Sequence, residues 1–295
     1  MQTALLILPN FVLILVGFIL TRRFDFGRDF WGGLEKLVYY VLFPALLFRS
    51  LAVAKIDFAA AAFPIAAALG FTFAGFLLSI LAGPLFGLER KLNATGSQCG
   101  YRFNTYVGLA VAGSLYGTPG VAMAALLLGV MIPEANLFAV GMLARHGPRG
   151  FLHELLTHPL LVSSLAGLAW NAAGVPLPGF AEQTLNLLGT MALPAGLLSV
   201  GAAMRIEAGQ GPVAAHAYWL AVKLAIVPAI AWGLARALGV SGLEARILLL
   251  CAALPTATNA YILAIRMTGE GGAVATQVTI GTLLSMVTIP LWLMN

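Results

Sequence analysis

Long apolar runs separated by short polar connectors make up this chain of 295 residues. A helix that crosses a bilayer needs about 20 mostly apolar residues, and ten runs meet that requirement. They lie near residues 3–21, 32–52, 58–87, 97–117, 119–144, 151–172, 182–204, 212–238, 245–268 and 271–294. The pattern predicts an all-α polytopic membrane protein with ten transmembrane helices.

The connectors are short and carry turn residues, as in Gly117-Thr118-Pro119-Gly120. None is long enough to hold a soluble domain. The first apolar run has no basic segment before it and no small-residue cleavage site after it. We therefore expect it to be a retained first span rather than a signal peptide.

Composition agrees with a bilayer as the surrounding solvent. Hydrophobic residues make up 60% of the chain and charged residues 9%, whereas a soluble domain carries about 25% charged residues. The excess of Lys and Arg lies in connectors, and no basic stripe with interleaved aromatic residues indicates nucleic-acid binding. Cys99 and Cys251 lie in apolar segments, where we expect them to pack as small apolar side chains.

The basic residues are divided unevenly between the two sides of the predicted membrane. The odd-numbered connectors hold Arg22, Arg23, Arg28, Arg90, Lys91, Arg145, Arg149, Arg205 and Arg266, and the opposite side holds Arg49, Lys55, Arg236 and Arg246. Because Lys and Arg concentrate in cytoplasmic loops, the odd-numbered connectors are expected in the cytoplasm and both termini outside.

Residues about 150 positions apart are alike. The matches include Leu5, Leu6 and Pro9 with Leu155, Leu156 and Pro159, and Pro44 and Ala45 with Pro194 and Ala195. Five spans in each half is an odd number, so the second half must enter the membrane in the opposite orientation. We expect two inverted five-helix repeats, residues 1–148 and 149–295.

Two spans contain features that break a helix in mid-membrane. Span four carries Arg102 and Asn104, and span nine carries Pro255, followed by Thr256 and Asn259. Proline removes a backbone donor, and unwound backbone at membrane depth occurs where it lines a cavity or is buried. Crossing of the two broken helices would bring four half-helix ends together, and their amino-terminal ends suit a carboxylate. The alternative is a pair of kinked helices packed through small residues.

Ionisable residues inside the predicted spans are further candidates. Glu134 follows Pro133 in span five. We interpret it as a proton carrier, as a cation ligand or as a hydrogen-bonded structural acid. Lys223 in span eight is interpreted as a partner of Glu134, as a fixed charge in place of a coupling sodium ion, or as a side chain that snorkels to an interface. Arg102 and Arg266 are expected to anchor the ends of their spans at the membrane interface.

The sequence argues against an enzyme. His153 and His158 are five residues apart, whereas a zinc-binding HExxH pair needs a spacing of four on one helical face. Glu134 has no evident His, Asp or Cys partner for acid–base chemistry. We expect no metal and no cofactor, and only H⁺ or Na⁺ as a candidate coupling ion.

Three motifs stand out, one at each break and one in span ten. They are Tyr101-Arg102-Phe103-Asn104-Thr105 with Gly108, Leu254-Pro255-Thr256-Ala257 with Asn259 and Gly269, and Thr282-Leu283-Leu284-Ser285 followed by Ile289-Pro290. These motifs resemble those of the auxin efflux carrier family, whose fold is related to that of the bile acid–sodium symporters. The resemblance covers the whole chain. The short connector between the halves is similar to that of bacterial members, which lie in the cytoplasmic membrane.

The resemblance implies a scaffold domain of spans 1, 2, 6 and 7 and a transport domain of spans 3–5 and 8–10 that moves as an elevator. It matches Asn104 and Thr105 to the family's span-four site, and Pro255, Thr256 and Asn259 to its span-nine site. Gly108 and Ala257 complete the expected substrate-binding set, and Glu134 and Lys223 are the coupling candidates. The implied cargo is a small organic anion, such as indole acetate in plants or a dicarboxylate in bacteria. A homodimer through the scaffold helices is left open.

The hypothesis is therefore a secondary active or facilitative carrier of a small carboxylate. Two alternatives remain open. A sodium-coupled carrier like the bile acid symporters would need acidic ligands near the breaks, and an anion channel could also be built from broken helices.

Overall fold

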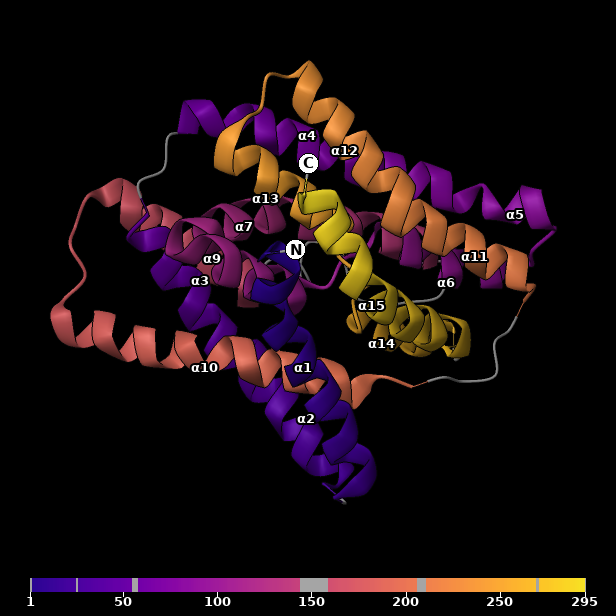
Figure 1. Ribbon diagram of the computed structural model, residues 1–295, viewed down its shortest axis with the longest axis horizontal. Helices are drawn as coiled ribbons and strands as arrows, with labels where there is room; N and C mark the ends of the chain where they lie inside the picture. The colour runs from indigo at the N-terminus through magenta and orange to yellow at the C-terminus, as the bar shows by residue number, and fades with distance from the viewer. Residues whose placement is uncertain are drawn as a thin grey trace. The chain divides into compact units, whose positions relative to one another are not determined.

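The computed structural model describes residues 2–24, 26–54, 58–143, 159–205, 211–268 and 271–294. Every regular element in these residues is a helix (Figure 1). The first half contains α1 (Gln2–Arg23), α2 (Arg28–Leu37), η1 (Val38–Leu42), α3 (Phe43–Ala52), α4 (Phe58–Ile80), α5 (Ala82–Phe86), α6 (Arg90–Tyr101) and α7 (Thr105–Leu143). The second half contains α9 (Pro159–Ala173), α10 (Gly179–Ala203), α11 (Val213–Ala221), η3 (Val222–Ile226), α12 (Val227–Ala237), α13 (Gly242–Ala253), α14 (Asn259–Thr268) and α15 (Gly272–Leu293).

Six helical stretches in the described residues are long and apolar enough to cross a membrane. They are Leu5–Arg23, Ala61–Phe86, Arg90–Ala139, Gly179–Ala203, Val213–Ala237 and Gly272–Leu293, and Pro159–Ala173 is a shorter apolar helix. The chain is thus an all-helical, multi-pass membrane protein. The number differs from the ten expected spans for four reasons. The fourth and fifth spans form one stretch, the described part of the sixth is only Pro159–Ala173, and the ninth is divided into α13 and α14. The expected second span does not meet the criterion of length and apolar composition.

The long helix α7 is not straight. Gly117 has φ 60° and ψ −152°, a conformation outside the helical region that suits only glycine. The kink falls within the Gly117-Thr118-Pro119-Gly120 stretch for which the sequence predicts a turn.

The helices group into two compact units. Unit 1 consists of residues 1–58, 106–129 and 152–203, and unit 2 of residues 59–105, 130–151 and 204–295. Each unit draws on both halves of the chain, with α1 to α3, α9 and α10 in unit 1 and α4 to α6 and α11 to α15 in unit 2.

Close approach of backbones holds unit 1 together. A Cβ atom at Gly17 of α1 would clash with the Leu198 carbonyl of α10, and one at Gly201 would clash with the Ile14 carbonyl. Small residues permit such approach between membrane helices, where lipid supplies no hydrophobic drive for association. Asn171 of α9 donates to the Ala52 carbonyl at 3.1 Å and so satisfies the carboxyl end of α3.

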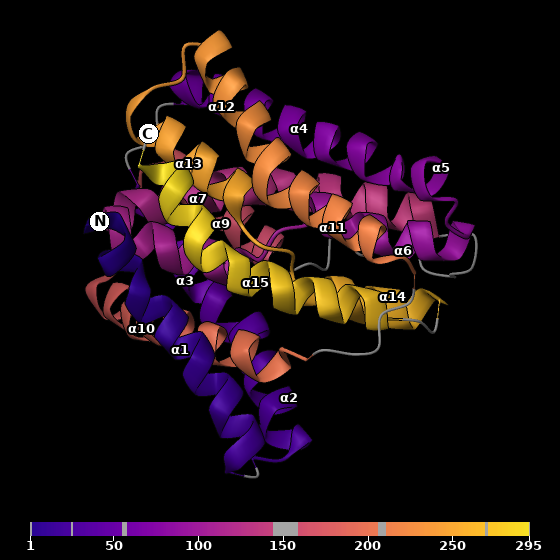
Figure 2. The same ribbon diagram turned by 45° about the vertical axis from the view of Figure 1, so that its right-hand side comes forward.

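In unit 2, α4 lies alongside α11 and α12 in both views (Figures 1 and 2). Two side chains of α11 tie these helices together. The Tyr218 hydroxyl donates to the Leu78 carbonyl at 2.7 Å, and Trp219 Nε1 donates to the Ser79 carbonyl at 3.0 Å.

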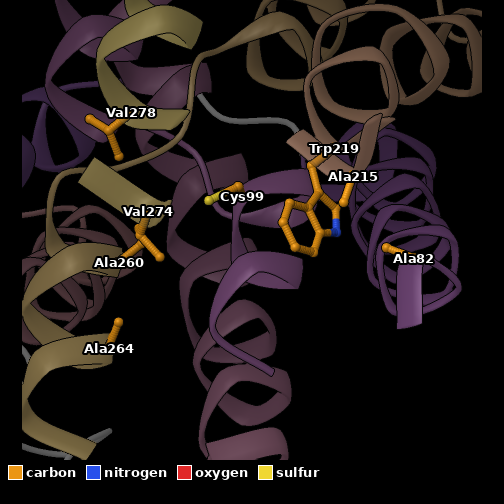
Figure 3. Packing of buried hydrophobic residues seen from close by; sticks show 8 residues of the cluster. All are labelled: Ala82, Cys99, Ala215, Trp219, Ala260, Ala264, Val274 and Val278. Atoms are coloured by element: carbon orange, nitrogen blue, oxygen red, sulfur yellow. The ribbon is translucent and has the colours of Figure 1, made fainter. Parts of the chain in front are cut away.

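A cluster of buried apolar side chains forms the core around Trp219 (Figure 3). Its members are Ala82, Cys99, Ala215, Trp219, Ala260, Ala264, Val274 and Val278, from α5, α6, α11, α14 and α15. Cys99 and Cys251 are both buried, so the expectation that they are buried packing residues is confirmed.

Two π-helical turns, η1 and η3, interrupt otherwise α-helical stretches. Each is followed at once by an α-helix with proline near its start, Pro44 after η1 and Pro228 after η3. A proline ring clashes with the carbonyl four residues before it and offers no N–H, and a wider turn relieves that clash. The Leu224 carbonyl, four residues before Pro228, instead accepts a hydrogen bond from Trp292 Nε1 at 2.9 Å.

Candidate functional site: two helix breaks joined in unit 2

Two helices of unit 2 stop in the stretches where the sequence predicts breaks. α6 ends at Tyr101 and the chain becomes helical again at Thr105, and α13 ends at Ala253 and is followed by α14 from Asn259. The second break has a local cause, because a residue before proline avoids the helical region. Leu254, which precedes Pro255, accordingly has ψ 142°.

The first break contains no proline. Arg102 has ψ 151°, which is extended backbone that any residue can adopt, and nothing in the local sequence demands it. We attribute this break to bonds made with the second one.

Two hydrogen bonds join the breaks. The backbone N–H of Asn104 donates to the Pro255 carbonyl at 2.8 Å, and the Thr256 hydroxyl donates to the Cys99 carbonyl at 2.7 Å. Cys99 is in the last turn of α6, where carbonyls lack helical partners. Since an unsatisfied buried carbonyl costs about 1–3 kcal/mol, the second break stabilises the end of the first helix.

Arg102 lies inside unit 2 rather than at a membrane interface. Its side chain is 7% exposed, and its guanidinium donates to Gln98 Oε1 at 3.2 Å and to Asn136 Oδ1 at 3.0 Å. The expectation of interface anchoring is therefore wrong for Arg102. The same expectation for Arg266 concerns a side chain outside the described part of the structure.

Lys223 is also buried, with 2% of its surface exposed. Its Nζ donates to the Ala252 carbonyl, at the carboxyl end of α13, at 3.1 Å. The snorkelling alternative is wrong, because the ammonium points to the end of a broken helix. No ion pair joins Lys223 and Glu134, both of which are described, so the structure gives no support to the pairing alternative.

Glu134 lies in the second part of α7, in unit 2. Its side chain is half-buried, and Oε2 has no hydrogen-bond partner among the described residues. The reading of Glu134 as a hydrogen-bonded structural acid is not supported at this oxygen.

The polar candidates differ in how accessible they are. Asn104 and Thr256 are buried at 3% and 2% exposure, Thr105 is half-buried and Asn259 is exposed. Ala257 and Pro255 are buried in the second break. Gly108 is buried in the first turns of α7, within the part of that helix that belongs to unit 1.

Sequence reasoning missed two contributors to this region. Gln98 lies four residues before Arg102, a spacing that places two side chains on one helical face, and this signal could have identified it. Trp292 could not be found in this way, because its partner Leu224 is 68 residues away in the chain.

Several residues named in the sequence analysis lie outside the described residues, among them the histidines at 153 and 158 and Gly269. Within the described residues, no group of three or more His, Cys, Asp or Glu side chains could hold a metal ion. Backbone amides and carbonyls, hydroxyls and side-chain amides at the two breaks are groups that can bind a small polar ligand.

These features define a class: an all-helical, multi-pass membrane protein with two interrupted helices bonded at their breaks. The model of the family described as "Membrane transport protein" matches residues 4–150 and 148–293. The chain belongs to this family, that of the auxin efflux carriers, and is a membrane transporter rather than an enzyme.

Similar proteins extend over nearly the whole chain. A Rhizobium meliloti protein named "Putative malonate transporter" is 26% identical over 96% of this chain and 92% of its own length. An uncharacterized transporter of Methanothermobacter thermautotrophicus is 26% identical over 97% of this chain and 96% of its own length. An uncharacterized transporter of Methanocaldococcus jannaschii is 23% identical, with 95% and 94% covered.

Proposed function

We propose that this chain is a secondary carrier of a small organic anion with at least one carboxylate, which binds where the two breaks meet. One observation carries the proposal: the hydrogen bonds Asn104 N to Pro255 O and Thr256 Oγ1 to Cys99 O. They hold two half-helix ends together within unit 2. Broken helices of this kind present amino-terminal amides to anionic substrate groups in secondary transporters.

The bond pattern divides the work among the candidate residues. The Thr256 hydroxyl and the Pro255 carbonyl already form the hydrogen bonds between the breaks, so we assign these two residues to shaping the site. Thr105 and the exposed Asn259 stand at the first positions of α7 and α14, where a carboxylate meets the positive end of a helix dipole. We assign substrate contact to these two residues and to the Asn104 side chain, all three of which lie in unit 2, with Ala257 leaving room for the anion.

We further propose a frame of ten spans in two inverted repeats, with spans four and nine crossing at their breaks. The two matches to the family model, residues 4–150 and 148–293, support a repeat. We propose that the protein lies in the cytoplasmic membrane of a bacterium with both termini on the outer side, because Lys and Arg concentrate in the odd-numbered connectors.

The way in which each unit combines both halves supports the proposed elevator mechanism. Unit 1 contains the proposed scaffold spans 1, 2, 6 and 7, and unit 2 contains α4 to α6 and α11 to α15. This composition supports a scaffold and a transport domain. Residues 106–129 group with unit 1, which favours a boundary between the two domains just after the first break.

The name of the Rhizobium meliloti relative supports a carboxylate as cargo. We test this with the purified protein, by measuring its melting temperature with acetate, malonate, succinate and benzoate, and with uncharged malonamide as a control. Ligand at 100 times its Kd stabilises a protein by about 2.7 kcal/mol. At least one carboxylate is expected to raise the melting temperature, and malonamide is not.

Asparagine variants then locate the site. We expect Asn104→Ala or Asn259→Ala to abolish the carboxylate-dependent shift and uptake into proteoliposomes, while the unliganded protein still inserts and folds. Asn186→Ala, at an exposed position of α10 in unit 1, is the control and should behave as wild type. Normal uptake by both site variants would refute the assignment, and single-channel currents would favour the channel alternative.

A further inference from the structure

Lys223 is a buried cation of unit 2, and its ammonium donates a hydrogen bond to a backbone carbonyl. Val222 and Leu224 beside it are buried as well, whereas Ala225 and Ile226, at the end of the same π-helical turn, are exposed. Removing an ammonium from water is costly unless it is paired or hydrogen-bonded. The described residues give Lys223 a carbonyl and no ion pair with a carboxylate.

The bonded carbonyl has a particular place in the fold. Ala252 O belongs to the last turn of α13, just before the break at Leu254 to Thr258. The last four carbonyls of a helix have no helical partners and carry its partial negative charge. In transporters with broken helices, such half-helix carboxyl ends coordinate the coupling Na⁺ or H⁺.

The backbone around Lys223 fixes this arrangement. Lys223 is the second residue of the π-helical turn η3, which Pro228 follows closely. π-turns of this kind interrupt helices at functional positions more often than elsewhere. The turn sets the direction of the Lys223 side chain toward α13.

We infer that the Lys223 ammonium is a built-in cation that takes the place of a coupling sodium ion at the carboxyl end of α13, so that anion transport needs no sodium. The inference rests on the proposed carrier function, and it adds that the Lys223 ammonium partly neutralises the bound anion. One fixed positive charge beside the second break offsets one carboxylate of the cargo, and its effect is strong because the surroundings have a low dielectric constant.

Sodium itself is the first probe. The melting temperatures of the wild type and of Lys223→Ala are compared in sodium chloride and in choline chloride at equal ionic strength. The wild type is expected to melt at the same temperature in both salts. Lys223→Ala removes the ammonium and leaves space beside the Ala252 carbonyl, so sodium is expected to raise its melting temperature above the choline value.

Malonate is the second probe, used in sodium-free buffer. Lys223→Met keeps the length of the side chain but loses its charge, and its malonate affinity is expected to fall by about tenfold. Lys223→Arg keeps the charge and should retain part of the affinity. Lys36→Met, at an exposed position of α2, is the matched control and should bind as the wild type does.

The outcomes separate this inference from the proposed function. If none of the carboxylates stabilises the wild type, the proposed function fails. If the wild type needs sodium for stabilisation by malonate, or if Lys223→Ala melts identically in both salts, the inference fails while the carrier function stands. A lysine that merely caps α13 would lower the stability of its variants without creating a difference between sodium and choline.

Discussion

At the scale of single residues, the glycines of α6 decide how unit 2 packs. A Cβ atom at Gly96 would meet the ring of Trp219, and one at Gly100 would meet the Ser79 hydroxyl. Trp219 cannot easily move away, because it is 1% exposed and its Nε1 is bonded to the Ser79 carbonyl. Because Gly96 and Gly100 have no side chains, the end of α6 can approach Trp219 and Ser79 closely, and this approach positions the first break.

We predict that Gly96→Val destabilises the protein by about 1–3 kcal/mol, since overpacking forces side chains and backbone to shift. The measurement is thermal unfolding in detergent. Gly233→Ala on α12 is the control, because nothing lies within 4 Å of a Cβ atom placed there, and it should be neutral or slightly stabilising. Equal stability of Gly96→Val and wild type would contradict the packing described for α6.

Residue types alone predicted where the two helices of the candidate site break. Asn104, Pro255 and Thr256 stand out in the sequence because polar groups and proline are unusual in an apolar span. Their partners do not stand out: the bond from Thr256 goes to a backbone carbonyl 157 residues away. Carbonyls are present at every residue, so only the folded chain shows which one is used. For the same reason the sequence could not tell that Arg102 points inward.

At the scale of elements, the π-helical turn η3 links a proline to a distant tryptophan. Pro228 has no N–H for the Leu224 carbonyl, and Trp292 of α15 supplies the missing donor at 2.9 Å. A proline inside an apolar span indicates that the helix is distorted there. It does not indicate whether the distortion is a kink, a break or a wide π-helical turn, because all three can precede a proline. Leu254-Pro255 leads to a break, whereas Pro44 and Pro228 follow π-turns, because tertiary bonds select the outcome.

Trp292→Phe is expected to destabilise the protein by about 1–3 kcal/mol, because it leaves the Leu224 carbonyl without a donor. Adding Pro228→Ala supplies a backbone amide near that carbonyl, so the double variant should lose less stability than the sum of the single variants. The stabilities of the wild type, the two single variants and the double variant are measured by thermal unfolding. Trp232→Phe, whose ring is 44% exposed, is the control, and strictly additive effects would argue against the link.

At the scale of the whole molecule, each unit takes helices from both halves of the chain. The sequence indicated the repeat through matched residues, and the family model matches the two halves in turn. The grouping into two units was not readable from residue matches, because it depends on which helices contact one another. The membrane orientation rests on the distribution of Lys and Arg, which gives a direct test.

We predict that Glu89→Cys is labelled from the cytoplasm and Ser241→Cys from outside, since the basic residues favour these sides. Both positions are exposed and precede α6 and α13. Labelling uses a membrane-impermeant maleimide on intact cells and on inverted vesicles, in a background where Cys99 and Cys251 are replaced by Ala. Labelling of both cysteines from the same side would contradict the proposed frame.

The bonds between the breaks also constrain the order of events during synthesis. Cys99 O and Asn104 N are made in the first half, yet their partners Thr256 and Pro255 belong to the second. Until that half has entered the bilayer, the end of α6 carries polar groups that lipid cannot satisfy. The first half must therefore be held by the insertion machinery, by water or by non-native contacts. The proposed binding region is completed only after the second break has been translated.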